Sequence, residues 1–289
     1  MGRELILAAL RLSRAPGVGA ARFRELLRRH GDPATALAAW LADLPACRAT
    51  LPAVSRRKSP TLDGLAAAEA WLAAGGTAVW WGGPGYPAAL LDLPEPPPVL
   101  FLRGTLPEGP ATAIVGTRHP VPAALALAEH LAADLARRGV TIVSGGAAGI
   151  DAAAHRGALA AGGRTVAVLG TGVDVVFPPD HAELFARIAA QGALVSELLP
   201  GTGPRRGFFP TRNRIIAGLA AETIVVQAPR RSGACLTARA ARRYGRPVRV
   251  VVPPCPDDPA WAGNLALLAA GARPLAVLLS QPSPSAARD

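Results

Sequence analysis

The residues best able to bind a charged ligand are crowded into residues 204–219, whose sequence is PRRGFFPTRNRIIAGL. Two phenylalanines stand there among four arginines. Aromatic faces stack on bases while guanidinium groups follow a phosphate backbone, as in proteins that bind single-stranded nucleic acids. The stretch predicts a binding site made of Arg205, Arg206, Phe209, Arg212, Asn213 and Arg214. The alternative is that one phenylalanine anchors the core and the arginines are only solvated.

Several short loops combine glycine with polar residues directly after apolar runs. Glycine permits a tight turn, and the N–H groups at the start of a following helix can point at an anion. Where an arginine follows, it adds a bidentate donor for phosphate. We predict phosphate contacts from these loops, made by Gly116, Arg118, Ser144, Gly145, Gly146, Gly170, Ser232 and Gly233. No single loop is specific, because many such turns need glycine only for the bend.

Acid–base or metal chemistry has one candidate pair, Asp151 and His155, four residues apart on an expected helix. Such a pair can bind a metal or transfer protons, but no third ligand or nucleophile accompanies it. We therefore favour a helix-start carboxylate and a hydrogen-bonded histidine. Ser232 lacks the G-x-S-x-G context of a nucleophilic serine. The sequence predicts no catalytic residue, no metal and no cofactor.

The usual nucleotide-binding motifs are missing from the sequence. No glycine loop has the G-x-G-x-x-G spacing of a dinucleotide fold followed by an acid that could hold a ribose. Lys58 is the only lysine, so no loop offers the lysine of a Walker motif. These absences argue against NAD and against a P-loop ATPase.

The charge of the chain is strongly positive, with a formal net value of +11. A genome rich in Arg and Ala codons could raise the arginine count without any function. Codon bias does not explain clustering, however: residues 203–246 hold ten arginines and one acid, Glu222. This concentration favours a nucleic-acid or phosphate partner over a solvated basic face.

From residue 112 onward, short apolar runs alternate with alanine-rich helical stretches. Strands are expected at 112–116, 140–144, 165–169, 194–197, 223–227 and 248–252, with a candidate edge strand at 275–279. Helices are expected near 122–138, 149–161, 181–191, 211–220, 234–244 and 264–270. Apolar strands alternating with helices predict an α/β fold, Rossmann-like and doubly wound, with a mainly parallel sheet. Ligands of such folds bind beyond the carboxyl ends of the strands.

The domain organisation follows from changes in composition. Residues 1–75 predict a small all-helical domain of helix-hairpin-helix or SAM-like type, in which Gly31-Asp32-Pro33 ends one helix and starts another. Residues 76–111 are rich in proline and glycine and predict a connector, either a semi-rigid linker or a packed extended arm, because prolines at this density prevent helix and remove sheet donors. Residues 112–280 form the Rossmann-like domain, and residues 281–289 predict a disordered tail.

Cellular location is suggested by cysteine usage and hydropathy. Three widely spaced cysteines, without nearby histidines, offer neither a disulfide framework nor a zinc site. The sequence shows no secretory signal and no apolar run of the roughly 18 residues that a membrane helix requires. We expect a soluble cytoplasmic protein.

The chain resembles the DNA-processing protein A family, also called DprA or Smf, over residues 80–279. The resemblance rests on motifs in family-like order, among them AIVGTR at 113–118, GIDAAAH at 149–155 and FPTRNRIIAGL at 209–219. Departures from the usual family residues include Ala148, Gln227 and Leu265. These departures affect pocket chemistry and not the fold.

The resemblance implies a binding protein without established catalytic activity. Family members bind incoming single-stranded DNA, protect it and help load the RecA recombinase during natural transformation and recombination, usually as homodimers. The implied binding roles fall on Arg118, Arg206, Phe209 and the Ser144–Gly145 loop. The C-terminal winged helix of many members is expected to be missing.

Two other functions remain open. A phosphoribohydrolase-like enzyme on a related Rossmann fold would use the same glycine loops and give Asp151 or Glu197 an acid–base role. The arginine cluster disfavours that alternative. A purely structural interaction protein would owe its basic patches to codon bias alone.

Overall fold

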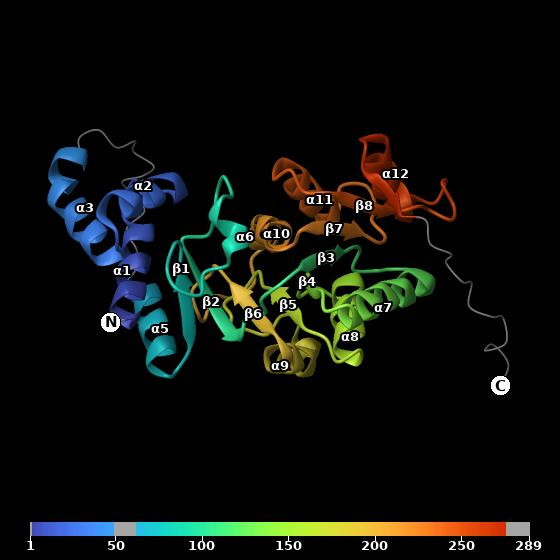
Figure 1. The fold of residues 1–289 in the computed structure, drawn as a ribbon, viewed down its shortest axis with the longest axis horizontal. Helices are drawn as coiled ribbons and strands as arrows, with labels where there is room; N and C mark the ends of the chain where they lie inside the picture. Colours follow the sequence, from blue (N-terminus) through green and yellow to red (C-terminus); the bar gives the residue numbers. More distant parts are fainter. Residues whose placement is uncertain (1, 49–61, 276–289) are drawn as a thin grey trace. The chain divides into compact units, whose positions relative to one another are not determined.

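A computed structural model describes residues 2–48 and 62–275 of the 289-residue chain. It separates into two compact units (Figure 1). The first unit takes in Met1–Arg103, Thr171–Val175 and Val195–Gly203, and the second takes in Gly104–Gly170, Val176–Leu194 and Pro204–Asp289. The domain boundaries expected at residues 75 and 111 stay predictions, and the expected tail lies outside the described residues.

Helices form the N-terminal part of the first unit, as the sequence predicts. Within the described residues they are α1 (Gly2–Arg14), α2 (Ala20–His30), α3 (Pro33–Arg48) and α5 (Leu62–Ala73). Gly31 ends α2 with a φ of 83°, which glycine adopts without strain. Asp32 then caps α3, because its Oδ1 accepts hydrogen bonds from the N–H groups of Ala34 and Thr35 at 2.8 and 3.0 Å. The predicted stop-and-start signal is confirmed.

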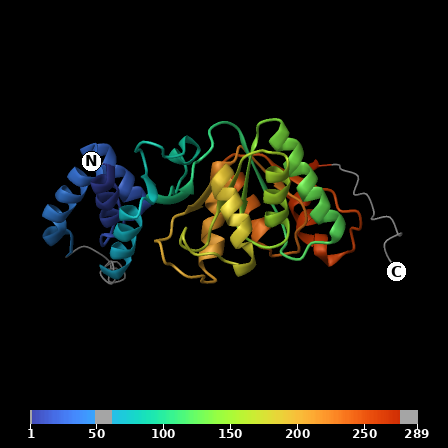
Figure 2. The same cartoon turned by 90° about the horizontal axis from the view of Figure 1, so that it is seen from below.

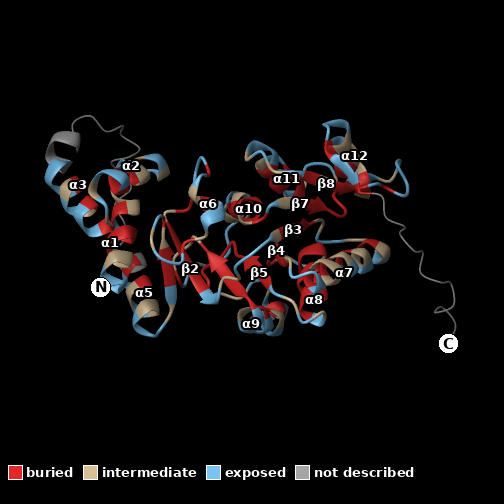
Figure 3. Ribbon diagram, viewed as in Figure 1, coloured by how far each residue is buried: buried red, intermediate tan, exposed pale blue. Residues whose placement is uncertain are grey.

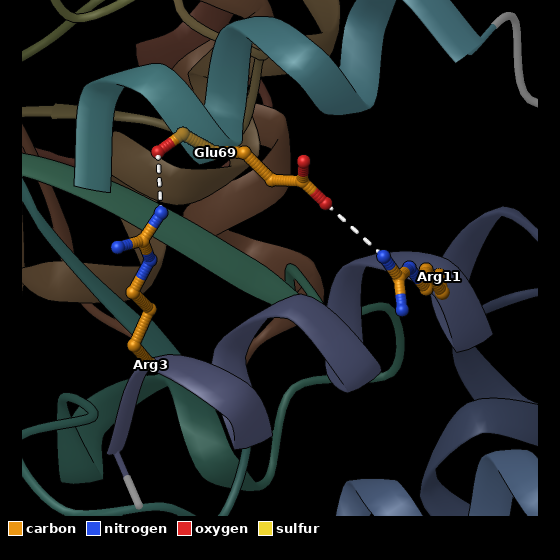
Figure 4. A network of polar contacts seen from close by, with 3 residues as sticks. All are labelled: Arg3, Arg11 and Glu69. Carbon is orange, nitrogen blue, oxygen red and sulfur yellow. Dashed lines mark hydrogen bonds and ion pairs between the residues drawn. The ribbon is translucent and has the colours of Figure 1, made fainter. Parts of the chain in front are cut away.

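Glu69 on α5 joins that helix to α1 (Figure 4). Its backbone carbonyl accepts a hydrogen bond from Arg3 Nη2 at 3.2 Å, and its carboxylate accepts one from Arg11 Nη2 at 3.1 Å. Exposed contacts of this kind stabilise a fold by at most about 1 kcal/mol. The buried side chains of Leu12 and Phe23 therefore contribute more to holding these helices together.

The segment 76–111 contains regular structure, so the expectation that its prolines exclude helices and strands is wrong. β1 (Thr77–Trp80) pairs antiparallel with β2 (Val99–Gly104), and α6 (Ala88–Leu91) lies between them in sequence. The prolines fall outside both strands. Proline density therefore marked the turns between the strands and not the whole segment.

The second unit alternates strands and helices as predicted. Its elements are β3 (Ala111–Val115), α7 (Pro122–Arg137), β4 (Thr141–Gly145), α8 (Ile150–Ala160), β5 (Thr165–Val168), α9 (Ala182–Gln191), α10 (Phe208–Leu219), β7 (Glu222–Val225), α11 (Gly233–Arg243), β8 (Val248–Val251), α12 (Ala262–Ala269) and β9 (Arg273–Leu275). β6 (Ala193–Ser196) divides its residues between the two units. Each predicted boundary from 112 to 270 lies within about three residues of the observed one, a shift typical of such predictions.

The strands of the second unit are parallel and follow the order β5-β4-β3-β7-β8-β9. From β3 the chain proceeds to β4 and β5, and after β6 it returns to the other side of β3 as β7. The order therefore reverses between β3 and β7, which makes this the switch point where ligands of doubly wound sheets bind. The expected fold class is confirmed. β9 begins before the expected edge strand, whose remaining positions lie outside the described residues.

Helices cover both faces of this sheet. Figure 1 shows α7, α8 and α9 on one side of the strands and α10 and α11 on the other. The central strands are buried along their length, while the helices keep exposed outer faces (Figure 3). This sandwich leaves the strand ends and the loops after them as the positions where polar groups can meet a ligand.

α7 and α8 lie side by side (Figure 2) and pack through unusually small residues. Every fourth residue of α7 along one face is a buried alanine: Ala124, Ala128, Ala132 and Ala136. Gly157 of α8 sits directly against the backbone of Glu129, where a Cβ atom would collide with the carbonyl oxygen. Small side chains let the two helix backbones approach closely and hold α8 at a fixed height above the sheet.

The residues that the structure describes include neither a helix long and apolar enough to span a membrane nor a group of three or more His, Cys, Asp or Glu residues placed to hold a metal ion.

Candidate nucleic-acid interface

A cavity of about 660 Å³ lies at the switch point of the second unit. Five segments line it: the loop after β3, the loop between β4 and α8 with the first turn of α8, the loop that carries Phe177, the start of α10 and the start of α11. Of the residues predicted to bind, the following line it: Gly116, Arg118, Arg206, Phe209, Arg212, Asn213, Ser232 and Gly233. The fold thus brings together loops that are more than 100 residues apart in sequence.

The loop after β3 is fixed by close backbone contacts. A Cβ atom on Gly116 would lie 2.5 Å from Ile150 Cγ1 and 2.9 Å from the carbonyl oxygen of Gln227, so glycine alone fits there. The N–H of Thr117 donates to the Gln227 carbonyl at 2.7 Å, and the Thr117 carbonyl accepts from the N–H of Ile150 at 3.1 Å. These contacts present Arg118, which is exposed, at the cavity.

Two phenylalanines and an arginine form one aromatic cluster at the cavity wall. The ring centres of Phe177 and Phe209 are 5.8 Å apart, and the guanidinium carbon of Arg118 lies 5.8 Å from the centre of the Phe209 ring. Phe177 keeps 40% of its surface exposed. The exposed ring of Phe177 and the half-buried ring of Phe209 offer base-sized apolar faces next to a phosphate-binding charge.

Phe177 was not among the residues predicted from sequence. An aromatic residue in a polar loop was its available signal, since aromatic residues make up only 4% of the chain. The helical prediction for 211–220 also placed the helix start too late, because α10 already begins at Phe208. Phe209 therefore projects from the first turn of a helix and not from a flexible loop.

The glycine positions next to the aromatic cluster form its floor. A Cβ atom on Gly170 would lie 2.7 Å from Phe209 Cδ1, so the ring packs directly against this glycine. Gly146 and Gly170 line an adjoining cavity of about 200 Å³ together with Arg118 and Phe209. A Cβ atom on Gly146 would lie 2.8 Å from Phe185 Cζ. Both glycines thus leave room for the neighbouring rings.

Arg212 and Asp151 are charged residues buried beneath the cavity. Arg212 is 6% exposed and donates to the carbonyl oxygen of Val168. A side chain at Gly145 would collide with both the Asp151 carboxylate and the Arg212 guanidinium, which shows that the two groups meet there. Arg212 is therefore held inside the fold, and only part of it reaches the cavity surface.

The protonation of this buried pair reflects desolvation opposed by mutual attraction. Burial raises the pKa of Asp151, and the positive charge of Arg212 counteracts the rise. Burial lowers the pKa of Arg212 to about 10, and Asp151 counteracts that fall. Arg212 therefore stays charged at neutral pH and contributes a positive field below the ligand.

His155 and Ser144 are buried and have internal partners. His155 Nε2 donates to the Gly145 carbonyl at 2.8 Å, and its Nδ1 lies 2.7 Å from Thr165 Oγ1. Burial lowers the pKa of His155 to about 4, so the ring is neutral at pH 7. The Ser144 hydroxyl donates to the Ile114 carbonyl at 2.6 Å. These contacts fit the structural role favoured for His155, and they leave Ser144 no exposed surface.

The start of α11 completes the cavity. Ser232 Oγ caps the helix by accepting a hydrogen bond from the N–H of Cys235 at 3.3 Å. Asn213 Nδ2 donates to the Gly233 carbonyl at 3.1 Å and so ties α10 to α11. The helix start places partial positive charge against the cavity. Asn213 acts here by positioning the α11 start.

Arg205 and Arg214 do not line this cavity. The guanidinium carbon of Arg205 lies 5.8 Å from the centre of the Phe208 ring. Arg206, one residue further along, is exposed and does line it. Arg231, which was not singled out from sequence, also lines the cavity. The only carboxylate at its wall is Asp151, within the part of the chain that the structure describes.

The fold and site define a Rossmann-like α/β protein with an N-terminal helical domain and a basic, aromatic-lined cavity at its switch point. The chain belongs to the family described as DNA recombination-mediator protein A, whose sequence profile matches residues 77–280. The profile of the DprA-like N-terminal HHH domain matches residues 4–69. The predicted family and the helix-hairpin-helix character of the N-terminal part are confirmed.

Similar proteins support this assignment. Protein Smf of Synechocystis is 45% identical over 204 residues, which are 68% of this chain and 50% of that protein. The chain thus spans about half the length of this curated relative. The solved structure of DNA processing protein A from Streptococcus pneumoniae has 34% identity and a TM-score of 0.66, covering 72% of this chain and 74% of that one.

A second solved structure concerns DNA processing protein A from Helicobacter pylori and its single-stranded DNA binding mode. It has 31% identity and a TM-score of 0.62, and the match covers 68% of this chain and 90% of that chain.

Proposed function

We propose that this protein binds single-stranded DNA in the cavity between the loop after β3 and the starts of α10 and α11. The observation that carries the proposal is the aromatic cluster of Phe177 and Phe209 with Arg118 beside it. A single strand exposes both base faces and phosphates, and this cluster offers a partner for each. A duplex hides its base faces and fits such a site poorly.

The contacts are divided between three kinds of group. Bases stack on the exposed ring of Phe177 and on Phe209. Phosphates are bound by the guanidinium groups of Arg118 and Arg206 and by the N–H groups at Gly233. Arg212, Asn213 and Ser144 act beneath the surface by fixing the loops that carry these groups. The contacts require no catalytic group, and we propose a binding protein and not an enzyme.

We further propose that the protein protects incoming DNA and helps load RecA during natural transformation and recombination, as a cytoplasmic homodimer. The family membership supports this role. The similarity to DNA processing protein A from Helicobacter pylori, which binds single-stranded DNA, supports the ligand. An open cavity at the sheet edge suits a mediator, since a strand held by a few stacked bases can be passed on.

Fluorescence anisotropy tests the ligand. Labelled oligothymidylate and a duplex of equal length are titrated at low and near-physiological salt. We expect tight binding to the single strand, weakening with salt by a slope of about −0.7 per phosphate neutralised. Equal, weak binding to both DNAs would reduce the interaction to bulk charge and overturn the proposal.

The loading role is tested separately by RecA-dependent strand exchange on DNA coated with a single-strand-binding protein. We expect addition of the protein to shorten the lag before exchange. An unchanged lag, with DNA binding intact, would leave a DNA-binding protein without mediator activity. Sedimentation velocity measures whether the binding-competent species is a dimer.

A further inference from the structure

A second cavity of about 660 Å³ lies in the same unit, between α11 and α12. Its charged wall is made of Arg230, Arg231, Arg239 and Arg242. Its opposite wall is apolar and comes from α12, through Ala266, Leu267 and Ala270. No carboxylate lines it among the described residues. A basic wall facing an apolar wall suits a ligand with both phosphates and uncharged rings.

α11 separates this second cavity from the first. Cys235, Arg239 and Arg242 follow one another at intervals of four and three residues and so share one helix face, which lines the second cavity. Leu236 and Thr237 point to the first cavity. The span from Cys235 to Arg242 is roughly 10 Å along the helix axis. The arginine face therefore extends away from the first cavity along α11.

The four arginines lack an internal counter-charge. All are exposed, and none forms an ion pair with a carboxylate within residues 2–48 or 62–275. Elsewhere in the unit, arginines such as Arg137 and Arg156 do have carboxylate partners, Asp134 and Glu129. Like charges gathered on one wall repel each other, and a bound anion removes that repulsion.

Arg231 lies between the two cavities, because it lines both of them. Its φ of 62° is the one positive value found for a non-glycine residue in the described part of the chain. Such a conformation is costly for a long side chain and tends to persist where function requires it. This turn places the arginine where it contributes to the lining of both cavities.

We propose that a single strand bound in the first cavity continues across Arg231 into the second cavity, where Arg239 and Arg242 bind its next phosphates. The inference rests on the proposed single-stranded DNA binding and extends it with a defined path. The apolar wall of α12 accommodates sugars and bases without stacking them. Arg230 lies at the same turn and adds to the charge along the path.

The path predicts a dependence of affinity on DNA length. Oligothymidylates of about 4 to 16 nucleotides cover the site sizes usual for single-strand-binding domains. The wild-type affinity should rise in a step at the length that reaches the second cavity. The variant R239Q/R242Q should keep the affinity for the shortest strands and lose at least about tenfold for the longest, with a salt slope reduced by about 1.4.

The matched control is R138Q/R187Q, which removes the same charge from exposed positions outside both cavities. It should retain the step. Thermal melting of both variants checks that their folds are intact, as expected for exposed arginines. The proposed path would be overturned if the affinity of R239Q/R242Q rose in the same step with DNA length as that of the control. It would also be overturned if R239Q/R242Q lost affinity equally at every DNA length. Either result would leave single-stranded DNA binding established.

A free nucleotide could supply the same phosphate chemistry. Calorimetric titration with deoxythymidine triphosphate separates the two sources. Triphosphate binding that R239Q/R242Q abolishes, with unchanged affinity for long strands, would assign the cavity to a nucleotide and overturn the path. If the wild type binds no single strand at any length, the proposed function itself fails, and the path fails with it.

Discussion

Replacing Phe209 by alanine should weaken single-stranded DNA binding more than it weakens the fold. The substitution removes the ring that packs on Gly170, faces Phe177 and lies 5.8 Å from the Arg118 guanidinium. A stacked base is worth about 1–3 kcal/mol, which corresponds to a loss of roughly 5- to 150-fold in affinity. The lost contact with Arg118 adds about 0.5–1 kcal/mol by freeing that guanidinium.

Phe208 provides the control within the same helix turn. The side chains of Phe208 and Phe209 are both half-buried, but Phe208 lies beside Arg205 and does not line the cavity. Anisotropy titrations with labelled oligothymidylate should show F208A within about twofold of the wild type, since it removes no stacked base. F209L keeps an apolar side chain without a π-face and should resemble F209A. Equal losses in F208A and F209A, or full affinity in F209L, would refute base stacking at this position.

Three further outcomes are expected. R118Q should reduce the salt slope of DNA binding by about 0.7, whereas R138Q should leave it unchanged; equal slopes would remove Arg118 from the phosphate contacts. G116A should lower the free energy of unfolding by about 1–3 kcal/mol in urea titrations, because a Cβ there overlaps its neighbours, while G203A, with open space around it, should change it little. Because the pKa of His155 is lowered to about 4 in the folded state, the unfolded chain binds the extra proton as pH falls below about 6.5. Stability should therefore fall by roughly 2 kcal/mol between pH 7 and pH 5, and H155Q should remove most of this loss; the same fall in H155Q would assign it to other groups.

The fold could be predicted from sequence because its signals are local. Apolar runs of four or five residues followed by alanine-rich stretches appear directly in the chain, and parallel strands follow from their being apolar on both faces. The convergence of Arg118, Phe209 and Gly233 also followed, since loops at the carboxyl ends of parallel strands meet at one edge. These predictions needed no knowledge of side-chain direction.

What could not be predicted depends on rotation about the helix axis and on distant partners. Arg212 looked like another phosphate-binding arginine, yet its place on α10 turns it inward toward Asp151, 61 residues away in sequence. Phe177 lies in a loop whose course is set by packing against α10 and not by a periodic pattern. The position of Arg231 between the two cavities depends on a backbone angle that no residue type signals, because arginine rarely adopts it.

The buried alanine face of α7 lowers the side-chain entropy cost of packing this helix against α8. Alanine has no side-chain rotamers to lose on folding, whereas each buried leucine loses about 0.5–1 kcal/mol of rotamer freedom. Buried Ala124, Ala128, Ala132 and Ala136 on α7, together with Gly157 of α8 against the backbone of Glu129, therefore pack with almost no side-chain entropy cost. The small residues of α7 thus give a rigid support beside α8, the helix whose first turn carries Asp151.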